Sequence, residues 1–153
     1  MIDCALFEPD IPQNAGAVLR LGACFGAAVH VVHPSGFALT DRNLRRVGLD
    51  YAARATLIEH ADWTIFEAWR RAAARRLVAL SAHAATDLYR FRFRVDDILL
   101  LGRETAGLPP AVTEAADAVL RIPIRPPNRS LNLAAAAAIA LAEALRQTDQ
   151  LPR

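Results

Sequence analysis

Short apolar runs alternate with longer amphipathic stretches along most of the chain. Continuous apolar runs bounded by turn residues are typical of parallel strands that are buried on both faces. This pattern predicts strands over residues 2–7, 29–32, 56–59, 77–81, 98–101 and 119–124. Helical spacing predicts helices over 14–25, 63–74 and 131–147, and 41–47 begins like a capped helix.

Repeated alternation of strand and helix favours an α/β fold with a mainly parallel sheet and helices on both faces. The length of 153 residues fits a single domain, 1–153, and neither an internal repeat nor a linker divides it. Ligands of such sheets bind beyond the carboxyl ends of the strands. Three polar turns are expected at that edge, at 81–83, 102–109 and 123–130.

Composition places the chain among folded globular proteins, with 54% apolar and 22% charged residues. Charged residues interrupt the apolar runs before any reaches the roughly 18 residues that span a membrane. The N-terminus carries Asp3 and no basic signal region, so we expect a cytoplasmic protein. Cys4 and Cys24 have no metal-ligand spacing and are expected to be buried, reduced thiols; no metal site is predicted.

All 18 basic residues are arginine, although the formal net charge is only +2. Arginine binds phosphate in a fork geometry that lysine cannot match, but a codon preference would give the same composition. The sequence Tyr89 to Arg94 alternates rings with arginines, so in a strand it would be either a phosphate-binding edge or an amphipathic edge with its rings in the core. Solvated helix faces are expected for two other basic groups, Arg42, Arg45, Arg46 and Arg54, and Arg70, Arg71, Arg75 and Arg76.

The segment 102–109, Gly-Arg-Glu-Thr-Ala-Gly-Leu-Pro, follows a predicted buried strand. Its glycines would let backbone amides approach a ligand, although a plain strand-to-helix turn explains them equally well. Glu104 would then be a carboxylate at a helix N-terminus. Neither a dinucleotide-binding Gly-x-Gly-x-x-Gly motif nor a P-loop occurs in the chain.

Two further segments gather polar residues at predicted helix starts. Residues 8–16 lead into a helix in which Asn14 is either an N-cap or a site residue, and Arg20 lies among apolar neighbours, where an arginine usually has an anionic partner. Residues 121–133 place an Asn-Arg-Ser-x-Asn cluster between a short strand and an alanine-rich helix. Such a helix start is typical of a binding site. His83 lies near the first polar turn, where a structural role is the more common one.

These segments together resemble the SPOUT superfamily of RNA methyltransferases, in particular the small proteins that methylate the ribose 2′-hydroxyl of the tRNA wobble nucleotide, cytidine or uridine 34. The resemblance runs nearly end to end. It is carried by Glu8-Pro9-x-Ile11-Pro12-Gln13-Asn14-x-Gly16 with Arg20, 44–51, 102–109, Ile122-Pro123 with 128–133, and Glu143-Ala144-x-Arg146-Gln147.

The resemblance implies a homodimer with a C-terminal deep trefoil knot that holds S-adenosylmethionine, and a tRNA anticodon stem-loop as the substrate. It implies a cofactor site lined by Leu80, Gly102, Ile122, Ser130 and Leu131. It also implies polar catalytic positions at Asn14, Arg20, Glu104, Ser130 and Asn132. Arg20 is a poor general base because guanidinium stays protonated, so we expect it to bind the phosphate beside the target ribose and to stabilise the developing alkoxide.

This chain departs from the family pattern at several positions. Ala134-Ala135 stands where relatives usually have Ser-Asn, Ala142 replaces a tyrosine, Leu145 replaces a tryptophan, and Ala52 replaces a histidine. These positions bear on how the wobble base is held. Two alternatives therefore stay open: a 2′-O-methyltransferase for another tRNA position or for ribosomal RNA, and a non-catalytic knotted RNA-binding module.

Overall fold

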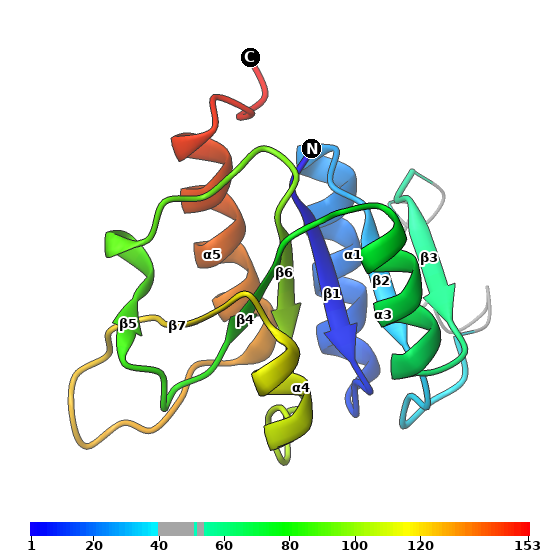
Figure 1. Cartoon of the computed structure of the whole chain (residues 1–153), viewed down its shortest axis with the longest axis horizontal. Coiled ribbons are helices and arrows are strands. Elements are labelled where there is room, and N and C mark those ends of the chain that lie inside the picture. Colours follow the sequence, from blue (N-terminus) through cyan, green and yellow to red (C-terminus); the bar gives the residue numbers. More distant parts are fainter. Residues whose placement is uncertain (40–50, 52–53) are drawn as a thin grey trace.

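The computed structural model describes residues 1–39, 51 and 54–153. Seven parallel strands form one sheet in the order β3-β2-β1-β6-β4-β7-β5 (Figure 1). The strands are β1 (Asp3–Phe7), β2 (Val29–Val32), β3 (Leu57–His60), β4 (Leu77–Leu80), β5 (Thr86–Asp87), β6 (Ile98–Leu101) and β7 (Ala118–Arg121). The helices are α1 (Pro12–Phe25), α3 (Trp63–Ala72), α4 (Pro110–Ala115) and α5 (Leu133–Gln147), with a 3₁₀ turn, η2, at Leu88–Arg90.

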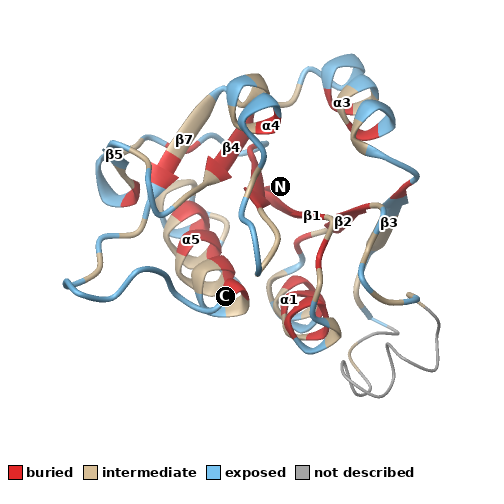
Figure 2. Cartoon of the chain, turned by 90° about the horizontal axis from the view of Figure 1, so that it is seen from below, coloured by how far each residue is buried: buried red, intermediate tan, exposed pale blue. Residues whose placement is uncertain are grey.

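Helices cover both faces of this sheet, as the apolar pattern predicts (Figure 2). Alternate residues of each strand point to opposite faces, so Leu99 and Leu101 pack with α1 and α5, whereas Ile98 and Leu100 pack with α3 and α4. The central strands are buried along their whole length, which explains their continuous apolar sequences. The predicted α/β fold is confirmed, and the trefoil knot stays a prediction.

The predicted helices and strands agree with the structure to within about two residues at most ends, the usual uncertainty of a boundary. Helix α1 begins at Pro12, whose fixed φ suits a first helical position, and ends at Gly26 in the left-handed conformation with φ 74°. The predicted helix at 41–47 lies outside the described residues, as do Arg42, Arg45, Arg46, Ala52 and most of the 44–51 motif. In the part of the chain that the structure describes, no helix is long and apolar enough to cross a membrane.

The segment 89–94 is not a strand, so neither a phosphate-binding edge strand nor an amphipathic edge strand forms there. Its first residues form η2, and the chain then crosses beside α5 with Phe93 buried and Phe91 half-buried against it. The two rings pack edge to face with centroids 5.0 Å apart. The Phe91 and Phe93 rings enter the core, as the amphipathic alternative expects, but Tyr89 is 58% exposed. Arg90, Arg92 and Arg94 are exposed as well.

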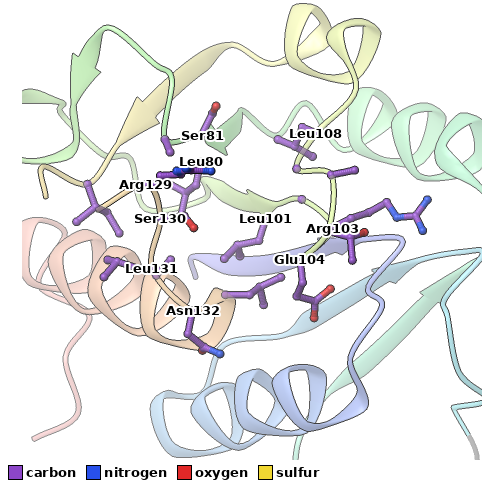
Figure 3. Close-up of a pocket in the computed structure, with 18 of the residues that line it drawn as sticks. Leu80, Ser81, Leu101, Arg103, Glu104, Leu108, Arg129, Ser130, Leu131 and Asn132 are labelled. Carbon is purple, nitrogen blue, oxygen red and sulfur yellow. The ribbon is translucent and has the colours of Figure 1, made fainter. Parts of the chain in front are cut away.

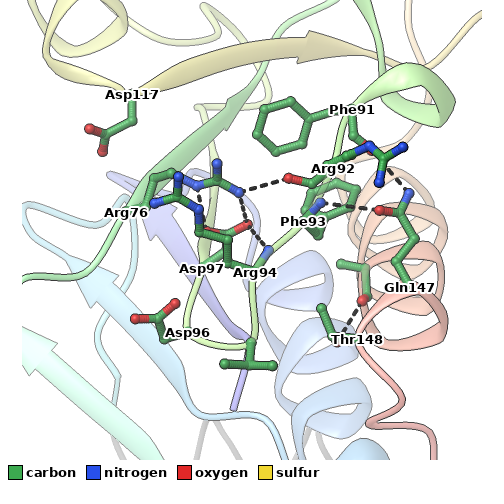
Figure 4. A network of polar contacts seen from close by, with 12 residues as sticks. Arg76, Phe91, Arg92, Phe93, Arg94, Asp96, Asp97, Asp117, Gln147 and Thr148 are labelled. Carbon is green, nitrogen blue, oxygen red and sulfur yellow. Dashed lines mark hydrogen bonds and ion pairs between the residues drawn. The ribbon is translucent and has the colours of Figure 1, made fainter.

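A polar network ties this crossing segment to the amino ends of the strands (Figure 4). The fully buried Asp97 accepts two hydrogen bonds of 2.7 Å from Arg76 and one of 2.8 Å from the Arg94 amide. Gln147 of α5 accepts from the Phe93 amide and donates to the Phe91 carbonyl. Each buried polar group in this network thus has a partner, as a stable interior requires.

Two other expectations about polar side chains need correction. Of the four arginines expected on a solvated helix face, only Arg71 is exposed. Arg70 is buried and pairs with Glu67 and Asp117. Arg75 pairs with Asp3, and Arg76 pairs with Asp97. Cys4 is buried, and burial raises the pKa of its thiol to about 12. Cys24, however, is exposed because it lies on the outer side of α1.

Candidate functional site

A cavity of about 730 Å³ lies at the carboxyl ends of the central strands (Figure 3). Its walls come from all three predicted polar turns, 81–83, 102–109 and 123–130, together with the start of α1 and of α5. Leu80, Leu101 and Leu120 form an apolar floor where β4, β6 and β7 end. Because β1 and β6 are neighbours whose chains leave toward opposite edges of the sheet, this is the position at which α/β sheets bind ligands.

The loop after β6 needs glycine at its first position. A Cβ atom on Gly102 would lie 2.4 Å from the carbonyl carbon of Gly107 and 2.6 Å from the Leu108 nitrogen. The loop closes on itself through two backbone hydrogen bonds between Arg103 and Gly107, of 3.0 and 2.8 Å. Its backbone therefore forms part of the cavity wall, a stronger role than a plain turn between a strand and a helix.

Glu104 and Asn14 join this loop to the start of α1. The Glu104 carboxylate accepts hydrogen bonds from the Asp10 amide at 2.8 Å, the Ile11 amide at 3.3 Å and the Asn14 side-chain amide at 3.1 Å. Asn14 is buried inside α1, whose N-cap is Ile11. The alternative of Asn14 as an N-cap is thus wrong. The Glu104 carboxylate accepts from backbone amides just before α1, and so it does not cap α4, the helix that follows its own loop.

Asn132 extends this chain of hydrogen bonds to α5. Its amide donates to the Asn14 side-chain oxygen at 2.9 Å, and its own oxygen accepts from the Ala134 and Ala135 amides as the N-cap of α5. Glu104, Asn14 and Asn132 therefore form one continuous polar chain, which we call the site chain. Helix α5 begins at Leu133, two residues later than predicted, because Asn132 is its cap.

A second link fixes the same loops to each other. Arg103 donates to Asp10 at 2.8 Å and approaches Glu8 at 3.5 Å, and Thr105 donates its hydroxyl to Asp10 at 2.6 Å. Hydrogen bonds from Arg103 and Thr105 lower the pKa of the Asp10 carboxyl. Sequence patterns gave no indication of Asp10, Arg103 and Thr105 as a connected group, because their partners are distant in the chain.

Of the predicted site residues, Arg20 alone stands outside the cavity wall. Leu80, Gly102, Ile122, Ser130 and Leu131 line the cavity, as do Asn14, Glu104 and Asn132. Arg20 is exposed on α1, and its guanidinium carbon lies 4.5 Å from the centroid of the Tyr51 ring. Among the described residues Arg20 forms a cation–π contact and no ion pair, so the expected anionic partner is not present there.

His83 also lines the cavity and is exposed. Its backbone amide donates to the Ser81 hydroxyl at 3.3 Å. Within the described residues no group of three or more His, Cys, Asp or Glu side chains has the arrangement of a metal site.

The sheet, the glycine loop and the polar helix start define an α/β protein with a small-molecule site at the carboxyl ends of its strands. The chain matches the model of the SpoU rRNA Methylase family over residues 1–142, and it belongs to that family. This match confirms the resemblance that the motifs indicate.

Relatives and solved structures agree with this assignment. The chain is 52% identical to a tRNA (cytidine(34)-2′-O)-methyltransferase of Beijerinckia indica subsp. indica, covering 97% of this chain and 93% of the relative. A solved structure described as "Structural insights into the 2-OH methylation of C/U34 on tRNA" has a TM-score of 0.89 and 42% identity, covering 96% and 95% of the two chains. The SpoU methyltransferase AviRb of Streptomyces viridochromogenes, solved with AdoMet, has a TM-score of 0.82 and 28% identity, covering 96% of this chain and 57% of AviRb.

Proposed function

We propose that this protein uses S-adenosylmethionine to methylate the ribose 2′-hydroxyl of the tRNA wobble nucleotide, a cytidine or modified uridine at position 34. The observation that carries the proposal is the site chain, which joins three sequence-distant motifs at one cavity in a protein 52% identical to a tRNA (cytidine(34)-2′-O)-methyltransferase. The whole chain, 1–153, would act as a single domain in the cytoplasm.

The cavity suits S-adenosylmethionine in size and lining. Cavities of roughly 300–1,000 Å³ hold small molecules, and this one is about 730 Å³. Leu80, Ile122 and Leu131 offer apolar contacts for a flat base, and the loop that begins at the closely packed Gly102 offers backbone groups. When bound, S-adenosylmethionine supplies an electrophilic methyl group.

Residues with free hydrogen-bonding groups would orient the ribose. The side-chain oxygen of Asn132 accepts from α5, and one hydrogen of its amide is donated to Asn14. Its second amide hydrogen makes no bond with the described residues. Ser130 is exposed beside it, and its hydroxyl makes no hydrogen bond with the residues that the structure describes. These two donors would hold the reacting 2′-oxygen, while Glu104 and Asn14 fix the orientation of Asn132.

Arg20 would bind the phosphate beside the target ribose and stabilise the developing alkoxide, with that phosphate as the proton acceptor. Arg20 is exposed and does not line the cavity of its own chain. In the proposed homodimer, Arg20 of one copy would reach the cavity of the other copy. Two inactive variants, Arg20→Ala and Asn132→Ala, should then recover activity when mixed and allowed to exchange subunits. An Arg20→Ala variant with near wild-type turnover would rule out the role itself.

Transfer of a labelled methyl group to bulk tRNA and ribosomal RNA, followed by mapping of the modified nucleotide, tests the function. We expect label on the ribose of nucleotide 34 of tRNA. Label on a base would overturn the proposed chemistry, and absence of transfer together with absence of S-adenosylmethionine binding in calorimetry would favour a non-catalytic module.

A second candidate is a 2′-O-methyltransferase for ribosomal RNA or another tRNA position. The observation in its favour is that the family model describes rRNA methylases. The same mapping experiment distinguishes the two, because label in ribosomal RNA alone would select this candidate.

A further inference from the structure

A second, smaller hollow of about 280 Å³ opens beside the main cavity. The two share Ala82, Ile122, Ile124 and Arg129 as wall residues, so they adjoin each other. Arg121, Asn128 and Arg129 supply the polar wall of the hollow. A strand of nucleic acid with its reacting ribose in the main cavity would therefore have room to continue into the hollow.

The charges around the hollow are mainly positive. Arg121 donates from its Nε to Asp87 at 2.6 Å, and the terminal nitrogens of its guanidinium have no partner among the described residues. Arg125 and Arg129 are exposed and form no ion pair with any residue that the structure describes. Of Arg121, Arg125 and Arg129, Arg121 pairs with Asp87, and no carboxylate among the described residues pairs with the other two. Unpaired guanidinium groups suit the geometry of phosphate oxygens.

A tight turn sets the position of the polar wall. The backbone amide and the side-chain amide of Asn128 both donate to the Arg125 carbonyl, at 3.2 and 2.9 Å. Two prolines, Pro126 and Pro127, fill the turn and restrict its backbone. Figure 3 shows Arg129 next to Ser130, on the side of the cavity that Leu80 and Ser81 form. Arg129 is therefore held at the boundary between the two hollows.

We propose that the second hollow binds a phosphodiester of the RNA strand next to the methylated nucleotide, with Arg129 and Arg121 as its ligands and Arg125 at its rim. This inference rests on the proposed function, since it assigns the place where the substrate strand leaves the catalytic cavity. The exposed Arg90 follows β5 on the same edge, where Thr86 and Asp87 pair with Leu120 and Arg121, and it would extend the basic surface (Figure 1).

The variant Arg129→Ala tests this site through the binding of tRNA and of S-adenosylmethionine. We expect the KM for tRNA to rise about tenfold at 0.1 M salt, and the slope of log K against log salt to fall by about one, because one phosphate contact is lost. Arg129→Lys should recover part of the affinity, since it keeps the charge without the fork. The affinity for S-adenosylmethionine, measured by calorimetry, should stay within about twofold of the wild-type value.

The matched control is Arg153→Ala, which removes the same charge from the last residue, an exposed arginine that lies 3.6 Å from Asp149. Its KM and salt slope should equal those of the wild type. An unchanged KM for Arg129→Ala, or a loss of S-adenosylmethionine affinity as large as the loss for tRNA, would overturn the inference. A wild-type protein that transfers no methyl group to RNA would instead overturn the proposed function, so the two failures are distinguishable.

Discussion

Two polar networks lie at opposite ends of the same parallel sheet and differ in how completely they are satisfied. At the amino ends, the fully buried Asp97 accepts hydrogen bonds from the Arg76 side chain and the Arg94 amide, and Gln147 bonds to the backbone of the same crossing segment at Phe91 and Phe93 (Figure 4). At the carboxyl ends, the site chain is linked just as continuously, yet it ends at the exposed Asn132, which keeps a free donor beside the exposed Ser130 (Figure 3). The first network holds the fold together, and the second has groups left over for a ligand.

The largest expected effect comes from breaking the amino-end network. Asp97→Ala leaves the Arg76 guanidinium, 19% exposed, without its carboxylate, and should lower the free energy of unfolding by about 3–5 kcal/mol. Urea denaturation followed by circular dichroism measures this. Arg153→Ala, which removes the exposed ion pair with Asp149, should leave stability unchanged. A loss below about 1 kcal/mol for Asp97→Ala would show that this network does not hold the fold.

A change in the site chain should affect catalysis more than stability. Asn132→Asp keeps the side-chain oxygen that caps α5 but replaces the amide donor to Asn14 with an acceptor. We expect methyl transfer to fall by about 100-fold, equivalent to about 2.7 kcal/mol. Single-turnover kinetics with labelled cofactor measures this.

The control for this change is Asn132→Ala, which removes both the donor and the cap, and which should additionally lower the free energy of unfolding by about 1 kcal/mol. Equal methyl transfer by Asn132→Asp and the wild type would mean that the hydrogen bond to Asn14 has no part in catalysis.

These two networks also mark the limit of what the sequence predicts. The run 98–101 is apolar throughout, and it predicts a strand with the bounds that the structure shows. This succeeds because a strand that is buried on both faces needs apolar residues at every position. The bond from Asn14 to Glu104 spans 90 positions, and that from Arg76 to Asp97 spans 21, so neither follows from local spacing.

The same limit applies at 89–94. Alternation of rings and arginines is a strand pattern, but the segment is not a strand: tertiary packing buries Phe93 and half-buries Phe91 beside α5, and the Arg76 guanidinium carbon lies 4.7 Å from the centroid of the Phe91 ring. The candidate site residues are predicted from motifs in three segments that together resemble one family, and all of them except Arg20 line the cavity. Arg103, Asp10 and Thr105 were not connected beforehand, because their contact depends on how the loops meet.

A smaller effect is expected from Gln147, which lies at the edge of the amino-end network. Gln147→Ala leaves the Phe93 amide and the Phe91 carbonyl without their side-chain partners, and should lower the free energy of unfolding by about 1–2 kcal/mol. Hydrogen exchange should show faster exchange of the Phe93 amide. Protection equal to that of the wild type would mean that the crossing segment does not depend on this contact.

The smallest expected effect is a pH dependence from His60. Burial, followed by the charge of His30 at 3.0 Å, lowers the pKa of His60 below its ordinary value of 6.5. His60 therefore binds a proton more readily in the unfolded chain than in the folded one. Its contribution to the free energy of unfolding is fully present above pH 6.5 and is lost as the pH falls through the lowered pKa. The Asp3 carboxyl, 3.6 Å from His30, has a pKa lowered by its interactions with His30 and Arg75, which outweigh desolvation, so its own contribution is lost only below pH 3.8.

Unfolding curves at several pH values between 7 and 5 test this assignment. His60→Phe should flatten the dependence of the unfolding free energy on pH, whereas the exposed His83→Gln should not. An equally steep dependence in His60→Phe would assign the effect to another group.

The most direct test of the proposed function compares two tRNAs that differ in one atom. One has cytidine at position 34 and the other has 2′-deoxycytidine, so that only the 2′-oxygen is removed. We predict that the protein binds both with similar affinity and transfers a labelled methyl group to the first alone, because the site chain and Ser130 serve the ribose hydroxyl. Methyl transfer to the deoxy tRNA at the same rate would place the acceptor elsewhere and contradict the account.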